Sequence, residues 1–214
     1  MDEFFDPDSW IMQTLSDLAD LVIANLLFVL TSVPIITLGA SVSALYSVVR
    51  TPGERRYSAS IFKNYFHAFF RNFKTATLAF LILLIPAVFV ACNVVLVLFG
   101  LLENSVISYV ICGVSILLFT FTWSYTFPLI AHFENSALRS LSNALVLSVA
   151  HLPTTVLVTV LNLLPWAILL FFTNFFFKFT MIWVFIAFAV IAKLNMLLLE
   201  RVFRRYMPES PAET

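Results

Sequence analysis

The chain has 214 residues, of which 61% are hydrophobic, 16% aromatic and only 11% charged. Soluble domains carry roughly 25% charged residues, so this composition excludes a water-soluble globular protein and indicates a surface that faces lipid. Twelve basic residues balance twelve acidic ones, and a net charge of zero gives no support to a nucleic-acid partner.

Long runs without a charged residue indicate the membrane spans. Such runs cover residues 21–49, 75–102 and 104–133, and each exceeds the roughly 20 helical residues that cross hydrocarbon. A longer run covers 140–177, and we expect Pro153 to divide it. Because no stretch alternates with period two, the predicted fold is all-α, a polytopic membrane protein with about five transmembrane helices.

The predicted segments form a single membrane domain and follow one another along the chain. They are an outer N-terminal segment at 1–17, a first span at 18–38, a cytoplasmic amphipathic helix at 58–74, a second span at 75–102, a third span at 105–131, a second cytoplasmic helix at 136–150, a fourth span at 153–173, a fifth span at 179–199 and a cytoplasmic tail at 200–214.

The basic residues predict the orientation of these spans. Six Lys or Arg residues fall within 50–74, one is Arg139, and three fall within 201–205, whereas the opposite side receives only Lys178 and an acidic N-terminus. Cytoplasmic loops are enriched in Lys and Arg. We therefore expect a multi-pass protein with its N-terminus outside and its C-terminus in the cytoplasm.

The segment 58–74 has the clearest helical pattern in the chain. Aromatic and aliphatic side chains recur on one side, namely Ile61, Phe62, Tyr65, Phe66, Phe69, Phe70 and Phe73, while polar ones occupy the other, among them Lys63, Arg71, Asn72 and, at its end, Lys74. Two interpretations stay open. The helix packs against lipid headgroups or its own protein, or it docks into the groove of a partner.

A shift of the sequence by 79 residues suggests an internal repeat. It matches Asn64 with Asn143, Thr75 with Thr154, Leu78 with Leu157, Leu84 with Leu163, and Pro86 with Pro165. Together with the shared order of span, cytoplasmic helix and Pro-containing span, these matches suggest a tandem repeat in which spans three and four repeat spans one and two. The interface between the repeats is then the place where we expect a cavity.

Several polar residues inside the spans are candidates for a polar pathway. Asp17 and Asp20 share one helical face and could meet a cation or a sugar hydroxyl, or simply face water at a helix N-terminus. Lys193 could snorkel to the inner boundary or pair with Asn195 or Glu200. The amides of Asn25, Asn93 and Asn162 are expected to form hydrogen bonds between helices, and Asn162 is also a pathway candidate.

Enzyme chemistry has no sequence support. The four glycines are too far apart for a phosphate-binding loop, and the three histidines do not have the spacing of a metal site. We therefore expect no catalytic residues, no bound metal, no cofactor and no enzymatic activity.

The first span and the residues after it carry a family signature. The stretch from Asn25 to Phe28, then Val33 to Ala40 with Pro34, Thr37, Gly39 and Ala40, and then Ser43 to Tyr46 with Ala44, resembles the opening of the YesL family of bacterial integral membrane proteins. The resemblance continues through Phe66 to Thr77. In physical terms, Pro34 should kink or end the helix, and the small residues after it allow close helix contact. We interpret the signature as a packing corner, with a substrate or partner contact as the alternative.

The resemblance also implies a cellular setting. Members of this family are bacterial cell-membrane proteins of unsettled activity, often encoded beside carbohydrate ABC importers in Gram-positive bacteria. It implies that this protein is an accessory to carbohydrate import, with an importer permease or ATPase subunit as partner in addition to membrane lipid. The alternative is an autonomous small-solute transporter or channel that forms a homo-oligomer and uses a cavity at the repeat interface.

Overall fold

The structure is a computed structural model that describes residues 10–50, 58–99 and 106–206. Within these residues there are helices but no strands, which confirms the all-α prediction. Five stretches are long and apolar enough to cross a membrane, so the predicted multi-pass membrane protein is confirmed. These stretches are Met12–Ser32, Ile61–Leu96, Tyr109–His132, Leu152–Phe171 and Thr180–Phe203. The parts of these predictions that fall on residues 1–9, 51–57, 100–105 and 207–214 lie outside the described residues.

The first helix, α1, covers Trp10–Ser32, so it begins earlier and ends earlier than the predicted span at 18–38. It ends there because Pro34 lacks a backbone N–H and disfavours helical geometry at the residue before it. A single 3-10 turn, η2 at Ile35–Thr37, leads into a second helix, α2 at Leu38–Val49, which the sequence did not predict as a separate element.

The helix α3 covers Ser58–Leu98 without interruption. We predicted two elements, a helix at 58–74 and a span at 75–102. This division is wrong, because one helix covers both segments as far as Leu98. No glycine or proline lies near the expected junction at Lys74, so the backbone hydrogen bonds continue through it. Pro86 lies inside the apolar half of the helix.

Three helices follow in the order α4 at Val106–His132, α5 at Ala137–Ala150 and α6 at Leu152–Phe171. Their bounds differ by one or two residues from the spans and the helix that we predicted at 105–131, 136–150 and 153–173. The helix α6 begins after His151, whose φ of −122° and ψ of 50° break the helical path, and Pro153 then occupies its first turn.

The last predicted span, at 179–199, is built from several helical pieces. A short helix, α7 at Thr173–Lys178, lies before the span, and the span itself begins with α8 at Thr180–Ile182. Next come a π-helical segment, η3 at Trp183–Ala187, and α9 at Phe188–Phe203. The π-helical segment widens the backbone in the first half of this span.

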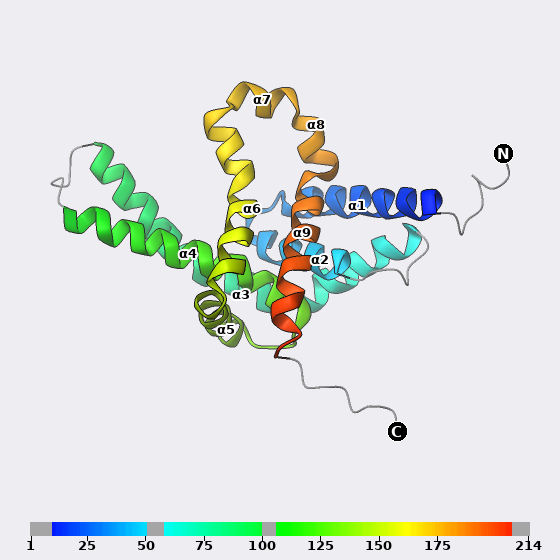
Figure 1. The fold of residues 1–214 in the computed structure, drawn as a ribbon, viewed down its shortest axis with the longest axis horizontal. Coiled ribbons are helices and arrows are strands. Elements are labelled where there is room, and N and C mark those ends of the chain that lie inside the picture. Colours follow the sequence, from blue (N-terminus) through cyan, green and yellow to red (C-terminus); the bar gives the residue numbers. More distant parts are fainter. Residues whose placement is uncertain (1–9, 51–57, 100–105, 207–214) are drawn as a thin grey trace.

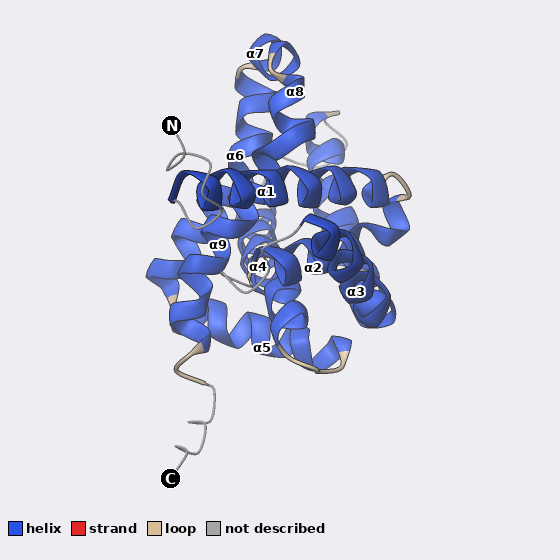
Figure 2. Ribbon diagram, turned by 90° about the vertical axis from the view of Figure 1, so that its right-hand side faces the viewer, coloured by secondary structure: helices blue, strands red, loops and turns tan. Residues whose placement is uncertain are grey.

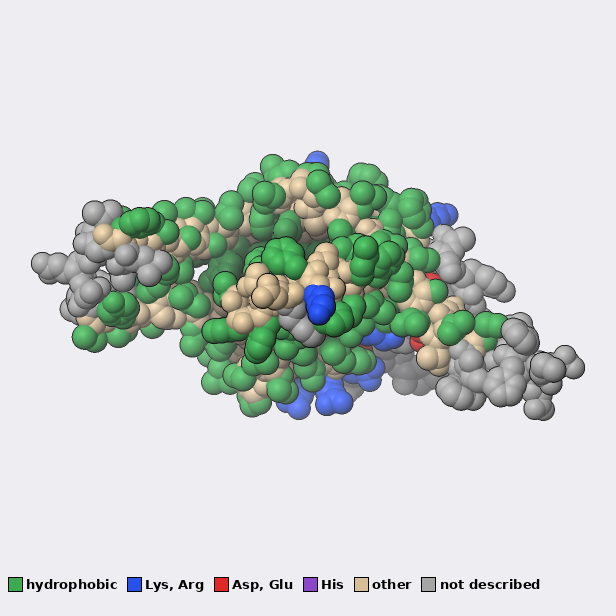
Figure 3. Space-filling view, turned by 90° about the horizontal axis from the view of Figure 1, so that it is seen from above, with side chains coloured by type: hydrophobic (Ala, Val, Ile, Leu, Met, Phe, Trp, Pro, Cys, Tyr) green, Lys and Arg blue, Asp and Glu red, His purple; other side chains and the backbone are tan. Residues whose placement is uncertain are grey.

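The long helices diverge instead of forming a parallel bundle. Figure 1 shows α3 and α4 projecting together to the left, α6 and α9 standing as an upright hairpin closed by α7, and α1 extending to the right. Figure 2 shows the same divergence from the side, with α6 and α7 rising above α1. From above, hydrophobic side chains cover most of the surface (Figure 3), as expected for a protein in lipid.

The helix α2 lies where the others meet. It contacts α1, α3, α4 and α9, and most of its residues are buried, including Gly39, Ala40, Ala44 and Tyr46. Small side chains let helices approach closely, which is the main source of packing energy between helices in lipid. The core of the protein therefore forms around a short helix that is itself too short to cross a membrane.

The predicted tandem repeat keeps part of its support. The two matched prolines lie in the helices that form the second and fourth spans, Pro86 in α3 and Pro165 in α6. The segments before them differ, since 58–74 is continuous with α3 whereas α5 and α6 are separated at His151. The repeat stays a prediction.

Candidate functional site

The corner between α2 and α3 depends on Gly39. A Cβ atom on this residue would collide with the backbone carbonyl oxygen of Ala76 and would lie 2.8 Å from the Cβ of Phe80. Ala40 and Ala44 have no exposed surface on the same helix. This geometry supports the packing interpretation of the signature residues.

Pro34 and Thr37 shape the turn that leads into this corner. The Thr37 hydroxyl donates to the carbonyl oxygens of Thr31 (2.6 Å) and Pro34 (2.7 Å). It thereby satisfies the Thr31 carbonyl where α1 ends, and it reinforces the bond that the Pro34 carbonyl accepts from the Thr37 backbone N–H (2.9 Å). The Tyr65 hydroxyl from α3 lies 2.7 Å from the Thr31 hydroxyl and fixes α3 to the same place.

Asn25 of α1 is fully buried against the π-helical segment. Its Nδ2 donates to the carbonyl oxygens of Trp183 (3.0 Å) and Val184 (2.7 Å), and its Oδ1 accepts from the backbone N–H of Ala189 (2.8 Å). A π-helical turn leaves backbone groups without their usual partners. The amide of Asn25 supplies those partners from another helix, so it holds α1 and α9 in one register.

A chain of polar side chains connects four helices. Asn195 of α9 donates through Nδ2 to the Tyr46 hydroxyl (3.1 Å) and to Oδ1 of Asn162 (2.7 Å). Asn162 of α6 donates to the Ser124 hydroxyl of α4 (3.2 Å), which lies 3.4 Å from the Thr159 hydroxyl. Neutral hydrogen bonds of this kind are the usual way to hold polar groups within apolar helices.

The two ends of this polar chain lie in different surroundings. At the α2 end, burial raises the pKa of the Tyr46 hydroxyl to about 12, so this group stays protonated and neutral at physiological pH. At the other end, Ser124, Thr159 and Asn162 face a pocket of about 240 Å³ between α4 and α6. The residues lining the pocket are Phe119, Thr120, Trp123, Ser124, Thr159, Asn162, Leu163 and Trp166.

One atom of the chain has no partner. Asn195 is fully buried, and its Oδ1 forms no hydrogen bond with any described residue. The N and O atoms of an amide are assigned from the hydrogen bonds around them. Turning the Asn195 amide would only exchange which atom faces Tyr46 and Asn162, so one polar atom stays unpaired in either orientation. Such a buried atom favours a water molecule beside it.

The predicted pathway residues do not come together. Asn162 is part of the polar chain, but Asp17 and Asp20 lie on the N-terminal half of α1 and form no hydrogen bond with any member of that chain among the described residues. Lys193 is half-buried on α9. The Lys193 and Asn195 pair does not form, since Oδ1 of Asn195, the atom that a lysine would donate to, has no partner among the described residues.

The prediction of an interhelical hydrogen bond is wrong for Asn93. Its Nδ2 donates to the carbonyl oxygen of Phe89, one turn earlier in α3. This half of α3 projects away from the core together with α4 (Figure 1). The Asn93 amide bonds within α3 and not to α4. Asn25 and Asn162 do bond across helices.

The aromatic side of 58–74 is divided between the core and the surface. Its inner part is buried and consists of Ile61, Tyr65 and Phe69, with Phe66 and Phe73 partly buried. Phe62 and Phe70 are exposed, together with Lys63, Arg71 and Lys74. Intramolecular packing therefore explains one side of the aromatic stripe, and lipid or partner contact stays a prediction for the exposed side.

Asn72 does not belong to the exposed polar side, where the helical pattern placed it. It is buried, and its Nδ2 donates to the Ser43 hydroxyl of α2 (3.2 Å). The packing of α2 against α3 covers this position, and Ser43 provides the acceptor that makes burial of the amide tolerable.

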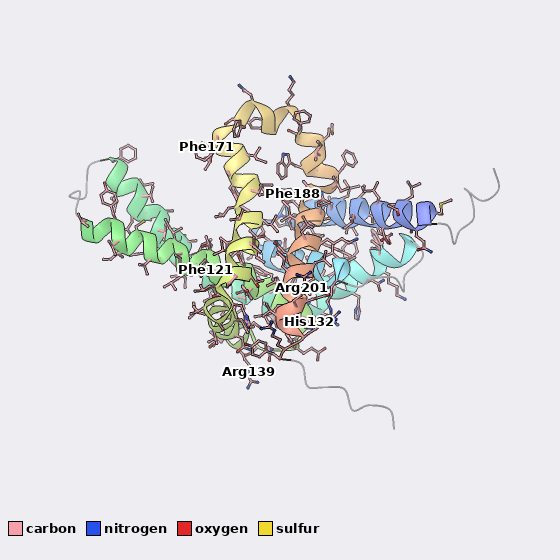
Figure 4. The ribbon with its side chains drawn as sticks, in the orientation of Figure 1. Phe121, His132, Arg139, Phe171, Phe188 and Arg201 are labelled. Carbon is pink, nitrogen blue, oxygen red and sulfur yellow. The ribbon has the colours of Figure 1, made fainter. Side chains whose placement is uncertain are left out.

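Basic side chains gather at the end of the molecule opposite α7. Figure 4 shows His132, Arg139 and Arg201 near the lower end, whereas Phe171 lies near the upper end. Arg50 is half-buried; burial lowers the pKa of its guanidinium, the Glu200 carboxylate raises it, and Arg71 lowers it. The described residues contain no group of three or more His, Cys, Asp or Glu side chains that could hold a metal ion.

The pocket and most of the polar chain were not predicted. The sequence did contain a signal, since Ser124, Thr159 and Asn195 interrupt apolar helices. That signal does not say which spans are neighbours, and the two tryptophans of the pocket, Trp123 and Trp166, are 43 positions apart in the sequence.

Comparison with known proteins identifies one family. Residues 21–94 match the model of a protein family of unknown function, DUF624. The YesL proteins are the known group within that family, so the resemblance of the signature residues to YesL proteins is confirmed over this segment. No curated protein and no solved structure gives a significant match.

Proposed function

We propose that this protein is a non-enzymatic accessory subunit in the bacterial cell membrane, and that it assists carbohydrate import by packing its α3–α4 hairpin against an ABC importer. The observation that carries the proposal is the open face of that hairpin. Its outer half projects beyond the core (Figure 1), and large apolar side chains are exposed along it, including Ile85, Val88, Phe89, Val110 and Val114.

Gly113 marks this face as a site of close approach. A Cβ atom on Gly113 would meet no atom within 4 Å, so nothing within the described protein requires a glycine there. Glycine inside a helix is less favourable than alanine by roughly 0.5–1 kcal/mol. In membranes, glycine at such a position lets a second helix approach closely. A span of a permease is the partner that we propose.

The choice of an importer rests on the family resemblance and its genomic neighbours, since DUF624 has no known function. The segment 58–74 was the other predicted docking element, toward a permease or an ATPase. Its inner side is already buried in this protein, which leaves only its exposed edge with Lys63, Phe70 and Arg71 for such a contact.

Replacing Gly113 with leucine should break this assembly without unfolding the subunit. We expect pull-down in mild detergent, followed by mass spectrometry, to recover importer permease in a stoichiometric amount with the wild type and at least about tenfold less with Gly113→Leu. The reason is that the larger side chain prevents close approach but meets open space in the isolated subunit. The control is Val146→Leu at an exposed position of α5, outside the hairpin, and this variant should keep the partner.

A different result would contradict the accessory role. The pull-down could instead recover a homo-oligomer without importer subunits, in equal amounts from the wild type and from Gly113→Leu. That result would show that the hairpin does not hold an importer. Solute flux from liposomes that contain only this protein would then favour the second candidate.

The second candidate, a small-solute transporter or channel, is favoured by the polar chain from Tyr46 through Asn195 to the pocket. This pocket lies between α4 and α6, both in the second half of the proposed repeat, and not between the two halves as predicted. If flux occurs in liposomes, Asn195→Leu should reduce it, because this residue is the central link of the chain.

We also propose that the N-terminus is outside and the C-terminus in the cytoplasm. The support is the position of Arg139 and Arg201 at one end and of Phe171 near the other (Figure 4), together with the positive-inside rule. A membrane-impermeant reagent should label a cysteine introduced at Lys178 in intact cells, in a background without Cys92 and Cys112, and should not label one at Arg139. The reverse pattern would contradict this topology.

A further inference from the structure

The walls and floor of the pocket between α4 and α6 differ in chemistry. Phe119, Trp123, Leu163 and Trp166 supply apolar walls, and Ser124, Thr159 and Asn162 supply hydroxyl and amide groups. The volume of about 240 Å³ is below the range of roughly 300–1,000 Å³ of sites for drug-sized ligands. The pocket therefore suits a small molecule with an apolar body and few polar atoms.

The rim of the pocket faces the surroundings of the spans. Trp166 is 63% exposed and Leu163 is 45% exposed, and both lie in the apolar helix Leu152–Phe171. A molecule dissolved among lipid chains would reach these side chains before any other part of the pocket. Access is thus from the lipid phase.

The floor of the pocket, formed by Ser124, Thr159 and Asn162, can accept a neutral group but not an ion. None of the lining residues carries a charge, and an unpaired ion in such a place is strongly unfavourable. The Ser124 hydroxyl already donates to the carbonyl oxygen of Thr120 (2.8 Å) and accepts from Asn162. The Thr159 hydroxyl has only the longer 3.4 Å contact with Ser124 among the described residues, so it retains capacity to bind an oxygen atom.

Asn162 is held in place for such contact. Its Oδ1 accepts from Asn195 and one of its two Nδ2 protons is used by Ser124, which leaves the second proton. The amide is therefore oriented by two helices before any ligand arrives, and preorganised polar groups lose little entropy on binding.

We propose that this pocket binds a small neutral amphiphile from the lipid phase. Its apolar body would contact Trp123 and Trp166, and a single hydroxyl or carbonyl oxygen would bind at Thr159 and Asn162. The proposal does not depend on the association with an importer, and its experiment uses the isolated full-length protein.

Brominated probes of similar size test the proposal, because bromine quenches tryptophan fluorescence on contact and two of the four tryptophans line the pocket. 2,2,2-Tribromoethanol carries a hydroxyl group and bromoform does not. With the purified protein in detergent, we expect saturable quenching by tribromoethanol and only a linear, non-saturable response to bromoform.

Matched variants identify the polar contact. Thr159→Val keeps the shape of the side chain, removes the hydroxyl and should raise the half-saturating tribromoethanol concentration about fivefold, the effect of one hydrogen bond. Thr122→Val is its control, because the Thr122 hydroxyl bonds only to its own helix at Leu118 (2.7 Å). Equal linear quenching by both probes, or an equal effect of both variants, would overturn the proposal.

A second pair guards against a folding defect in Thr159→Val. Asn162→Leu removes the amide at the floor and should abolish the difference between tribromoethanol and bromoform. Asn93→Leu removes an amide that bonds only within α3 (2.8 Å to Phe89) and should leave the difference intact. If all four variants keep wild-type circular dichroism and the wild-type half-saturating concentration of tribromoethanol, the pocket is not the binding site.

Discussion

Replacing Gly39 with leucine is expected to prevent stable folding of the protein. A single Cβ atom at this position already overlaps the carbonyl oxygen of Ala76 and lies 2.8 Å from the Phe80 Cβ, and backbone atoms cannot move aside as a flexible side chain would. Overpacking in a core typically costs about 1–3 kcal/mol, and four side-chain atoms against a backbone should cost at least the upper value. We expect loss of most protein from the membrane fraction.

Gly39→Ala should show the same effect in a smaller and measurable form. We expect a clear fall in the thermal unfolding temperature, followed by tryptophan fluorescence in detergent. Gly113→Leu is the matched control, because the same change there meets open space and gains helix propensity. If Gly39→Leu accumulated and unfolded like the wild type, α2 and α3 would not be in the close contact that the structure shows.

The five spans were predictable because lipid imposes a simple condition on the sequence. A spanning helix must be long and nearly free of charges, and uncharged runs such as 75–102 and 104–133 report this directly. For the same reason, the sequence did not predict α2 as a separate helix. Its residues belong to the uncharged run 21–49, where composition does not distinguish a span from a short buried helix after Pro34.

The boundary within α3 shows a second limit of the sequence. The amphipathic pattern of 58–74 and the apolar run of 75–98 predict different surroundings, and they were divided for that reason. The surroundings of a helix change without any change in its backbone, so α3 continues through Lys74. Pro34 disrupts the backbone after α1 and ends that helix, whereas no such residue lies near Lys74 in α3.

The candidate site depends on which helices are neighbours, and this is where sequence reasoning ended. Asn25 and Asn162 were expected to bond across helices, and both do. Their partners, Trp183 and Ser124, are 158 and 38 positions away, and no pattern in one sequence pairs them. Asn93 had the same apparent properties, and its amide bonds within its own helix.

Replacing Asn25 with leucine is expected to destabilise the junction of α1 with the last span. Leucine is similar in size but leaves the carbonyl oxygens of Trp183 and Val184 and the N–H of Ala189 without the contacts that the amide makes. Such hydrogen bonds in membrane proteins average about 0.6 kcal/mol and reach about 1.7 kcal/mol, so three of them predict a loss of about 2–5 kcal/mol. The measurement is equilibrium unfolding of the purified protein in mixed detergent.

Asn93→Leu is the control for this loss, since it changes the same residue type where the amide bonds only to its own helix; it should change stability by less than about 0.5 kcal/mol. Asn25→Asp provides the decisive comparison. A carboxylate can still accept from Ala189 but cannot donate to the two carbonyls, so it should be at least as unstable as leucine. Wild-type stability of Asn25→Leu would mean that the last span reverts to a regular α-helix without help from α1. The π-helical segment would then be a local preference of residues 183–187, and Asn25 would not be what holds the two spans in register.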